Sequence, residues 1–418
     1  MQGGATYAKP APGNALRGDA SVQAPAFTLI LLSLVTGFVV VIEPAPTDMF
    51  FALGFGLLVI VAGSRLYVPR SLYLVYGLLL AYVVLSVISL YQAHVVTFGL
   101  RYFLITLYLL LIPPVFVHFN VLFGRSAADR MQWAFILGAT FSAIVGLMAL
   151  LHVAPGPATL YFKSDDGLRL SPLFKDPNVF GPYMSAAGLL LVSRMCCQSA
   201  RRRFMGFALA GFILLMMFLA FSRGAWINSA IAAATFVFGM LVFGRSWRQI
   251  KWVLILLLIA SVAMLVAMPL LLDELGLTQF LADRARLQGY DDHRFENWEN
   301  AFGVIVAEPL GIGPGHYVGR NDFAQSAFDL ATHNLYLKVA VENGWLSFLS
   351  FFGAIGCILA MLLGSFFRRD ARLPIRIMIF AIILGQLANS LAVDSLHWRH
   401  LFVLLGFACG EIALFRRA

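Results

Sequence analysis

Long apolar runs alternate with short polar connections along most of the chain. Twelve of these runs approach the roughly 20 residues that a straight membrane-spanning helix needs. The pattern therefore predicts an all-α, polytopic integral membrane protein with about twelve transmembrane helices. The predicted spans are 27–43, 49–63, 72–91, 99–118, 131–153, 179–193, 204–221, 225–243, 252–272, 333–365, 376–393 and 400–415.

Local composition refines this pattern at two places. Pro113 and Pro114 lie inside the fourth run, and proline removes a helical hydrogen bond, so a kink is expected there. Residues 1–25 are rich in Ala, Gly and Pro and lack an apolar core, which predicts a disordered cytoplasmic tail. Residues 26–418 are then a single transmembrane domain.

The charged residues predict which connections share a side. Twelve spans put both termini on one side, and that side holds 19 of the 30 Lys and Arg residues but only four of the 21 Asp and Glu residues. Because basic residues concentrate in cytoplasmic loops, both termini are predicted to be cytoplasmic. The longer loops, 154–178 and 273–332, then face outward, and function is expected there.

Composition limits the possible function classes. Hydrophobic residues make up 60% of the chain, charged residues only 12%, and the mean hydropathy is +0.83. A soluble domain carries about 25% charged residues, so a soluble enzyme, a nucleic-acid-binding domain and a disordered scaffold are excluded. Topology-setting loop residues account for the net charge of +9, and membrane lipids, not nucleic acid, are the expected surroundings.

Several basic residues lie on the predicted outer side, against the general trend. Arg223 stands in Phe-Ser-Arg-Gly-Ala-Trp at the outward junction of two spans, and its guanidinium suits phosphate oxygens. The alternative is a snorkelling or salt-bridged residue that only fixes topology. Arg169 and Lys175 precede a turn at Asp176 and Asn178 that opens the sixth span, where a phosphate would fit. Helix capping is the alternative role for Asp176 and Asn178.

The largest outer loop contains two further patterns. Residues 292–307 predict an amphipathic helix, with one face formed by Phe295, Trp298 and Phe302 and continued by Ile305. Such a helix would lie in the membrane interface or over a cavity. Glycines then alternate at 311, 313 and 315, which indicates a tight turn that brings backbone close to a ligand or another helix.

A histidine is the candidate general base. His333 and Asn334 stand where the chain re-enters a span, and the unperturbed histidine pKa of about 6.5 suits proton transfer near neutral pH. An interfacial anchoring role is the alternative. His316 and His397 are the next candidates. No spacing in the sequence predicts a metal site, a nucleotide loop or a cofactor.

Together these residues form an ordered series of motifs. The series resembles the bacterial O-antigen ligase and O-antigen polymerase superfamily, and it covers about 169–344. Its members are Asp-Pro-Asn-x-Phe-Gly (176–181), Ser-Arg-Gly (222–224), Arg-x3-Trp (294–298), Pro-Leu-Gly-x-Gly (309–313), and His-Asn-x-Tyr leading to Glu-Asn-Gly (333–344).

The resemblance implies a metal-independent, periplasmic glycosyltransferase in the bacterial inner membrane. An O-antigen ligase moves O-antigen glycan from undecaprenyl diphosphate to the lipid A-core oligosaccharide in lipopolysaccharide biosynthesis. Arg223 and Arg294 would hold the diphosphate, with Arg169, Lys175 and Arg286 as weaker candidates. His333 would be the base, and Asn334 would orient the acceptor or the histidine. Asn178 is the second candidate for an acceptor-binding or orienting role.

Two alternatives remain at this point. An O-antigen polymerase would use the same donor to extend lipid-linked repeats, and a lipid-linked glycan transporter is a more distant possibility. One outer loop, 273–332, is far longer than the others, and this favours the ligase because many polymerases use two such loops. Direct attack by the acceptor would invert the anomeric centre, because no carboxylate nucleophile is apparent.

Overall fold

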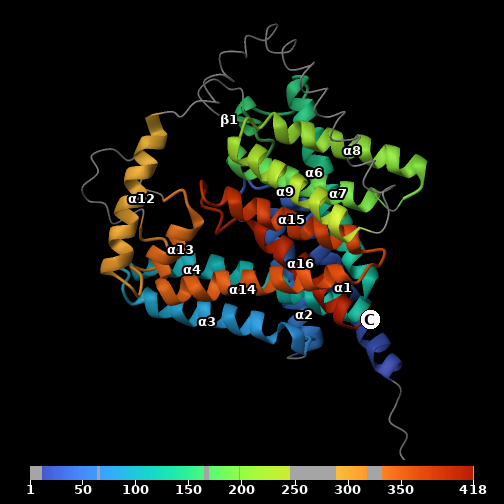
Figure 1. Ribbon diagram of the computed structural model, residues 1–418, viewed down its shortest axis with the longest axis horizontal. Coiled ribbons are helices and arrows are strands. Elements are labelled where there is room, and N and C mark those ends of the chain that lie inside the picture. Colours follow the sequence, from blue (N-terminus) through green and yellow to red (C-terminus); the bar gives the residue numbers. More distant parts are fainter. Residues whose placement is uncertain are drawn as a thin grey trace, which may run out of the picture.

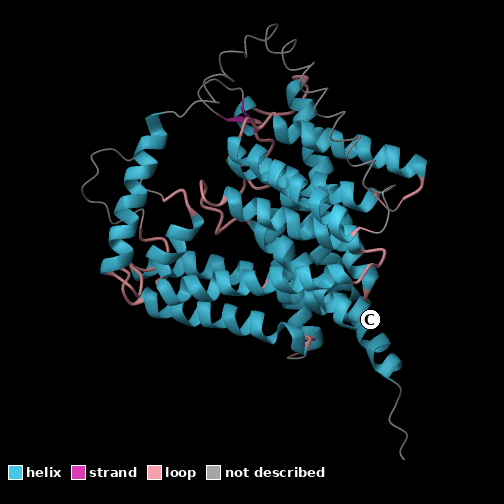
Figure 2. Cartoon of the chain, in the orientation of Figure 1, coloured by secondary structure: helices cyan, strands magenta, loops and turns pink. Residues whose placement is uncertain are grey.

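A computed structural model describes residues 12–63, 66–163, 169–196, 198–244, 289–317 and 332–417. These residues are almost entirely helical (Figure 2). One short antiparallel hairpin pairs β1 (Phe162–Lys163) with β2 (Arg169–Leu170). The prediction of an all-α membrane protein is confirmed.

The helices follow the predicted apolar runs. Every predicted run that falls within the described residues contains helix, whereas 252–272 lies outside them. The runs 99–118 and 333–365 each cover two helices, and the helical part of 27–43 ends at Phe38. Six segments of the described chain are long and apolar enough to cross a membrane, so the number of twelve spans stays a prediction. The helices are α1 (Pro12–Val35), α2 (Pro46–Ala62), α3 (Tyr73–Leu90), α4 (Val96–Leu110), α5 (Ile112–Phe123), α6 (Arg125–Leu150), α7 (Pro177–Met195), α8 (Ala200–Phe218), α9 (Arg223–Phe243), α12 (Gly289–Ala307), α13 (Leu335–Asn343), α14 (Trp345–Gly364), α15 (Leu373–Asn389) and α16 (Arg399–Arg417), with 3-10 turns η1 (Thr36–Phe38), η2 (Arg70–Leu72), η3 (Ala158–Leu160) and η4 (Ser365–Phe367).

Proline positions explain two helix boundaries. The predicted break in the fourth run is confirmed: α4 ends at Leu110 and α5 begins at Ile112, so Pro113 falls in the first turn of α5, where no helical N–H is needed. At the N-terminus the structure differs from the expected tail, because α1 begins at Pro12. Alanine has the highest helix propensity, and alanines in residues 12–25 allow the first helix to start early.

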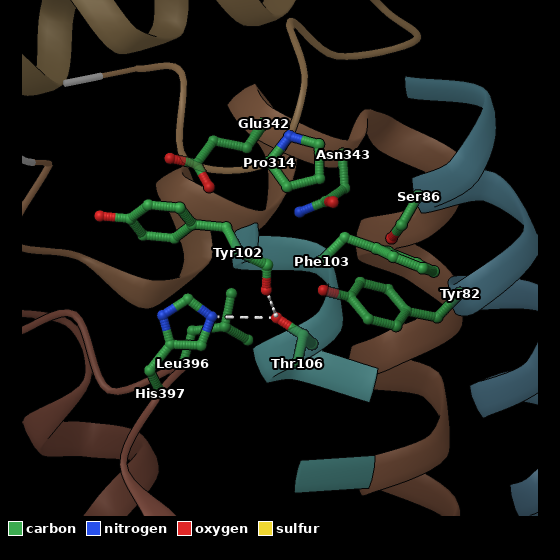
Figure 3. Close-up of a pocket in the computed structure, with 10 residues that line it drawn as sticks. All are labelled: Tyr82, Ser86, Tyr102, Phe103, Thr106, Pro314, Glu342, Asn343, Leu396 and His397. Atoms are coloured by element: carbon green, nitrogen blue, oxygen red, sulfur yellow. Dashed lines mark hydrogen bonds between the residues drawn. The ribbon is translucent and has the colours of Figure 1, made fainter. Parts of the chain in front are cut away.

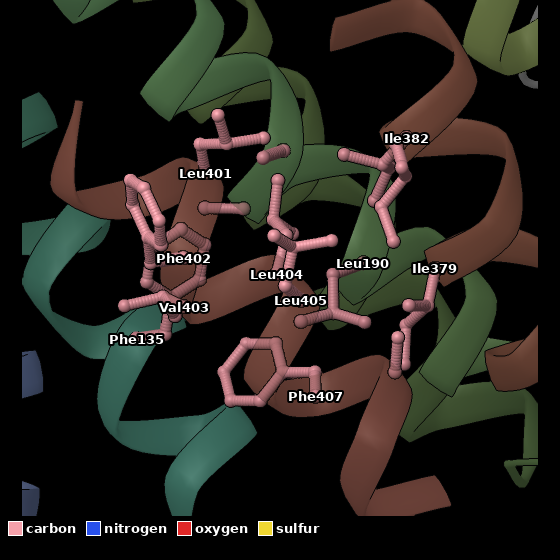
Figure 4. Packing of buried hydrophobic residues seen from close by; sticks show 14 of the residues in the cluster. Phe135, Leu190, Ile379, Ile382, Leu401, Phe402, Val403, Leu404, Leu405 and Phe407 are labelled. Carbon is pink, nitrogen blue, oxygen red and sulfur yellow. The ribbon is translucent and has the colours of Figure 1, made fainter. Parts of the chain in front are cut away.

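The bundle has α15 and α16 in its middle. In Figure 1, α7, α8 and α9 lie on one side of this pair, and α3, α4 and α14 lie on the other. Buried Leu, Ile and Phe side chains from α6, α7, α15 and α16 fill the space between them, including Phe135, Leu190, Ile379 and Leu404 (Figure 4). The core therefore fixes the ends of α15 and α16 relative to the other helices.

Helix α12 crosses the ends of other helices (Figure 1). It agrees with the helix expected at 292–307, and the residues of the predicted apolar face divide between buried and exposed positions. Ala301 and Ile305 are buried against α13 and the glycine-rich loop, whereas Phe295 is 53% and Phe302 56% exposed. The predicted placement of this helix in the membrane interface or over a cavity stays a prediction.

Charged residues gather in groups that respect the predicted sides. Arg372 donates to Glu411 and to Asp129, all predicted on the cytoplasmic side. Arg399 binds Asp48 through two nitrogens at 2.6 and 2.5 Å, both residues being predicted on the outer side. Each of these ion pairs joins residues that are predicted to lie on the same side of the membrane.

Candidate functional site

Asn178 joins three segments at the start of α7. Asp176 caps this helix by accepting a hydrogen bond from the Asn178 N–H at 2.8 Å, so its capping role is confirmed. The Asn178 side chain does not cap. Its Oδ1 accepts from Arg169 Nη2 at 2.9 Å and from Ser222 Oγ at 2.9 Å. The loop before α7 is thereby tied to the junction of α8 and α9.

Arg169 reinforces the same junction. Its Nε donates to the carbonyl of Ala220 at 3.3 Å, and the N–H of Leu170 donates to the carbonyl of Leu219 at 3.0 Å. The half-buried guanidinium therefore contacts the C-terminal end of α8 as well as Asn178. These contacts position the loop, whether or not Arg169 also contacts a phosphate.

Arg223 occupies the first position of α9. Ser222 caps this helix by accepting from the Ala225 N–H at 3.4 Å, and Phe221 just before it has a left-handed φ of +46°. A non-glycine residue in that region is uncommon and requires support from its surroundings. The half-buried Arg223 side chain therefore lies at the N-terminus of α9, directly after this sharp turn. A helix N-terminus itself favours anions.

His333 stands in a second constrained turn. Its φ is +43°, again in the left-handed region, and its side chain is half-buried. Trp298 of α12 holds this turn by donating from Nε1 to the carbonyl of Thr332 at 2.8 Å. Such backbone strain clusters at functional positions, where the surrounding structure maintains it.

Asn334 has a structural role. Its Oδ1 accepts from the N–H groups of Tyr336 at 2.9 Å and Leu337 at 3.1 Å, which caps α13. This amide is therefore engaged with the backbone, and an additional role in orienting His333 or an acceptor stays a prediction.

The C-terminal end of α15 brings the two turns together. The carbonyl of Ser390 accepts from the Leu335 N–H at 2.9 Å, and the carbonyl of Leu387 accepts from Tyr336 Oη at 3.0 Å. On the other side, the side chain of Asn389 lies so close to Gly224 that an added Cβ would overlap it. The Ser-Arg-Gly turn (222–224) and the His-Asn turn (333–334), about 110 residues apart, thus flank one helix end.

The glycine-rich loop packs against α13 as expected. Gly311, Gly313 and Gly315 have φ values of 85°, 100° and 75°, which side chains rarely adopt. The N–H of Gly313 donates to the carbonyl of Glu342, and the N–H of Gly315 donates to Glu342 Oε2 at 2.8 Å. The prediction of a tight turn beside another helix is confirmed.

A buried acid–base cluster lies behind the His-Asn turn. Lys338 Nζ is 2.5 Å from Asp394 Oδ2. Burial alone would raise the pKa of Asp394, but the Lys338 ammonium holds it below its usual value. Glu342 lies one helical turn from Lys338 on α13 and is buried. Sequence inspection missed this cluster, although the four-residue spacing of Lys338 and Glu342 on one helix was visible.

A small cavity adjoins this cluster (Figure 3). Its volume is about 10 Å³, near the size of one water molecule, and Glu342, Tyr82, Ser86 and His397 are among its lining residues. In Figure 3 the His397 ring points toward Thr106, and its Nε2 lies 3.0 Å from Thr106 Oγ1. This cavity is too small for a substrate.

The other histidines differ from His333. Both ring nitrogens of His316 are engaged, because Nε2 accepts from the Val95 N–H at 3.2 Å and Nδ1 lies 2.9 Å from the Pro314 carbonyl. Desolvation, together with the Lys338 charge, lowers the pKa of His397 to about 4. His316 is therefore a structural residue, and His397 a weaker base than an ordinary histidine.

The remaining predicted ligands are not brought to the two turns by any described contact. Lys175 forms an ion pair with Glu43 at the protein surface. Arg294 belongs to α12, but its side chain lies outside the described residues, as does all of Arg286. Within the described ranges no group of three or more His, Cys, Asp and Glu residues is arranged to hold a metal ion.

Comparison with known families agrees with the motifs. Residues 206–352 match the family described as O-antigen ligase, which confirms the resemblance to the O-antigen ligase and polymerase superfamily. The matched segment includes the Ser-Arg-Gly turn, α12, the glycine-rich loop and the His-Asn turn. No curated protein matches the chain.

Proposed function

We propose that the protein is an O-antigen ligase. In this proposal it transfers glycan from undecaprenyl diphosphate to the lipid A-core oligosaccharide on the periplasmic face of the bacterial inner membrane. The family match supports this class of reaction. One structural observation supports the site: Arg223 and His333 lie in two constrained turns, and both turns contact the C-terminal end of α15.

The proposed chemistry assigns a separate task to each turn. Negative charge grows on the diphosphate as the sugar C1–O bond breaks, and Arg223 at the N-terminus of α9 stabilises it, with Arg294 as a second clamp. His333 accepts the proton from the acceptor hydroxyl while its oxygen bonds to C1. The products are the glycosylated acceptor, with inverted configuration, and undecaprenyl diphosphate.

This mechanism uses no metal or nucleoside triphosphate. Departure of the diphosphate supplies the driving force. Arg169 contributes mainly by holding Asn178 and the α8–α9 junction beside Arg223, at the contacts of 2.9 and 3.3 Å given above. Lys175, paired with Glu43, becomes the weakest diphosphate candidate among the described residues.

Reconstitution tests the enzymatic proposal. The purified protein in lipid vesicles is supplied with undecaprenyl-diphosphate-linked glycan and lipid A-core, without ATP and with a metal chelator. Formation of glycosylated lipid A-core supports the ligase. Movement of the donor across the bilayer without any new glycosidic bond would instead support a transporter.

The polymerase alternative predicts a different product. A polymerase would lengthen the lipid-linked glycan in the same vesicles even when the lipid A-core is omitted. In cells lacking the protein, loss of a ligase leaves unmodified core together with accumulated lipid-linked polymer. Loss of a polymerase leaves core capped by a single repeat.

A further inference from the structure

Helix α12 carries an exposed apolar stripe, formed by Phe295, Phe302 and Val306. Val306 is 68% exposed, and more than half of each phenylalanine is exposed as well. Positions 7 and 11 residues apart lie within about 20° of one line along an α-helix, so the three side chains share one side. Within the residues that the structure describes, this side of α12 is left open to an apolar partner.

The rest of the α12 surface divides into a polar side and a side against the protein. Glu296, Glu299 and Asn300 are exposed and lie about 40° to 140° around the helix from Phe295. Ala301 and Ile305 are buried on the other side of the stripe. The apolar stripe thus lies between protein and a polar edge, as expected of a helix at a boundary between water and lipid.

Contacts at the C-terminal end of α12 fix its level relative to two apolar helices. The Pro309 carbonyl accepts at 3.1 Å from the N–H of Trp345, the first residue of α14. Gly313 lies so close to Ala93, just after α3, that an added Cβ would overlap it. The segments of α3 and α14 are both long and apolar enough to cross a membrane. The end of α12 therefore lies where two spans leave the bilayer.

Exposed aromatic side chains mark the same level. Tyr91, directly after α3, is 90% exposed, and Trp345 is 41% exposed. Tyr and Trp concentrate where a membrane span meets the boundary between lipid and water. In Figure 1, α12 runs across the direction of α3 and α14 beside these ends, so its long axis follows the plane of the membrane.

We propose that α12 docks on the predicted outer surface of the bilayer through Phe295, Phe302 and Val306. The occupant of the stripe is the acyl-chain region beneath neutral lipid headgroups. The exposed charged residues that the structure describes on α12, Glu296 and Glu299, are both acidic. Attraction to anionic lipid therefore does not drive this docking, which depends on apolar contact.

Docking would also set the height of the His-Asn turn above the membrane. Trp298 of α12 donates to the Thr332 carbonyl, directly before His333, at 2.8 Å. The Trp298 ring packs edge-on against Phe295 of the stripe, with ring centroids 5.4 Å apart. The stripe and the turn are thus mechanically linked. This consequence rests on the proposed function, because it concerns the proposed base, whereas the docking itself does not.

Nitroxide spin labels measure the depth of the stripe directly. In a variant without its four native cysteines, Phe302→Cys and Val306→Cys are labelled, with Glu296→Cys and Asn300→Cys as matched controls on the polar side. The full chain is placed in phosphatidylcholine nanodiscs without any glycan donor. Collisions with oxygen, which concentrates in lipid, are compared with collisions with a water-soluble nickel chelate. Labels at 302 and 306 should favour oxygen at a depth of about 5–10 Å, and labels at 296 and 300 should favour nickel.

Two results would overturn the docking. Nickel access at 302 and 306 equal to that at 296 and 300 would place the stripe in water. Protection of 302 and 306 from both reagents would show that protein covers the stripe, whether from this chain or from a second copy.

A charged substitution tests the link to the His-Asn turn. Phe302→Asp should shift a label at Val306→Cys toward nickel and lower glycan transfer about tenfold or more, because small misplacements of a reacting group are costly. Asn300→Asp, on the polar side, should change neither. Both residues are exposed, so both variants should unfold like the wild-type protein. Wild-type transfer by a Phe302→Asp variant that has left the membrane would refute the link. Docked labels in a wild-type protein that transfers no glycan would retain the docking and overturn the ligase.

Discussion

Arg223 combines a side-chain charge with a helix N-terminus. We predict that Arg223→Ala lowers the rate of glycan transfer by about 10²-fold or more, the usual loss when one donor to a developing anion is removed. Arg223→Lys should restore only part of the rate, because lysine keeps the charge but not the planar fork. Arg201→Ala, an exposed residue at the start of α8, is the matched control and should transfer normally. Vesicle reconstitution measures these rates, and wild-type transfer by Arg223→Ala would remove this residue from the site.

His333 and Asn334 are adjacent but should fail in different ways. His333→Ala should bind the donor normally and lose about 10²-fold or more in transfer rate, since a base acts on the acceptor. Asn334→Ala should instead destabilise the protein by about 1 kcal/mol, because α13 loses its cap. Donor binding, transfer rate and thermal unfolding are measured on both variants. If His333→Ala loses less than about tenfold in transfer rate, His333 is not the general base.

His397 gives the fold a dependence on pH. Its pKa is lowered from 6.5 to about 4 in the folded protein, so the unfolded chain takes up this proton first as pH falls. Stability contributed by the neutral ring is therefore complete above pH 6.5 and is lost between pH 6.5 and 4. The thermal midpoint should fall over this range, and His397→Gln should reduce the slope. An equal slope in wild type and variant would contradict this assignment.

At the scale of elements, a buried ion network fastens the opposite end of α15. Arg372 just before α15 donates from Nε to Glu411 Oε2 of α16 at 2.9 Å and from Nη1 to Asp129 Oδ1 of α6 at 3.0 Å. Gln132 Nε2 also donates to Glu411 Oε1 at 3.1 Å. The Glu411 carboxylate therefore links α6, α15 and α16 at this end of the bundle.

Loss of that carboxylate should cost more than loss of a surface charge. Glu411→Gln leaves a buried arginine without its main partner, and breaking a buried pair typically destabilises by about 3–5 kcal/mol. The variant should unfold at a clearly lower temperature in detergent. Arg369→Ala, an exposed residue of the same end, should unfold like the wild-type protein. Equal midpoints for Glu411→Gln and Arg369→Ala would show that the network adds no stability.

Sequence rules predicted the local features of these elements better than their mutual contacts. The Asp176 cap, the break before Pro113 and the glycine turn follow from neighbouring residues alone, and all three are present. The bond between Asn178 and Ser222 joins positions 44 residues apart, and the approach of Asn389 to Gly224 depends on helix packing. No local pattern marks such long-range contacts, which is why the role of α15 emerged only from the fold.

For the whole molecule, the property to test is which side of the membrane each loop faces. The predicted orientation places Ala200 in the cytoplasm and Ala158 outside, and both residues are exposed. In a variant without its four native cysteines, a cysteine replacing Ala158 should react with a membrane-impermeant thiol reagent in intact spheroplasts. A cysteine replacing Ala200 should react only after the membrane is permeabilised. Reaction of both from outside would refute the predicted orientation.

The shared contact of both turns with α15 has a consequence for how this chain tolerates change over evolutionary time. Each helical residue adds 1.5 Å and about 100° of rotation. Insertion or deletion of one residue in α15 would swing Asn389 away from Gly224 and shift the carbonyl that accepts from Leu335. Substitutions on the outer surface of the bundle can accumulate, whereas the length of α15 between Arg372 and Ser390 should stay constant among functional descendants.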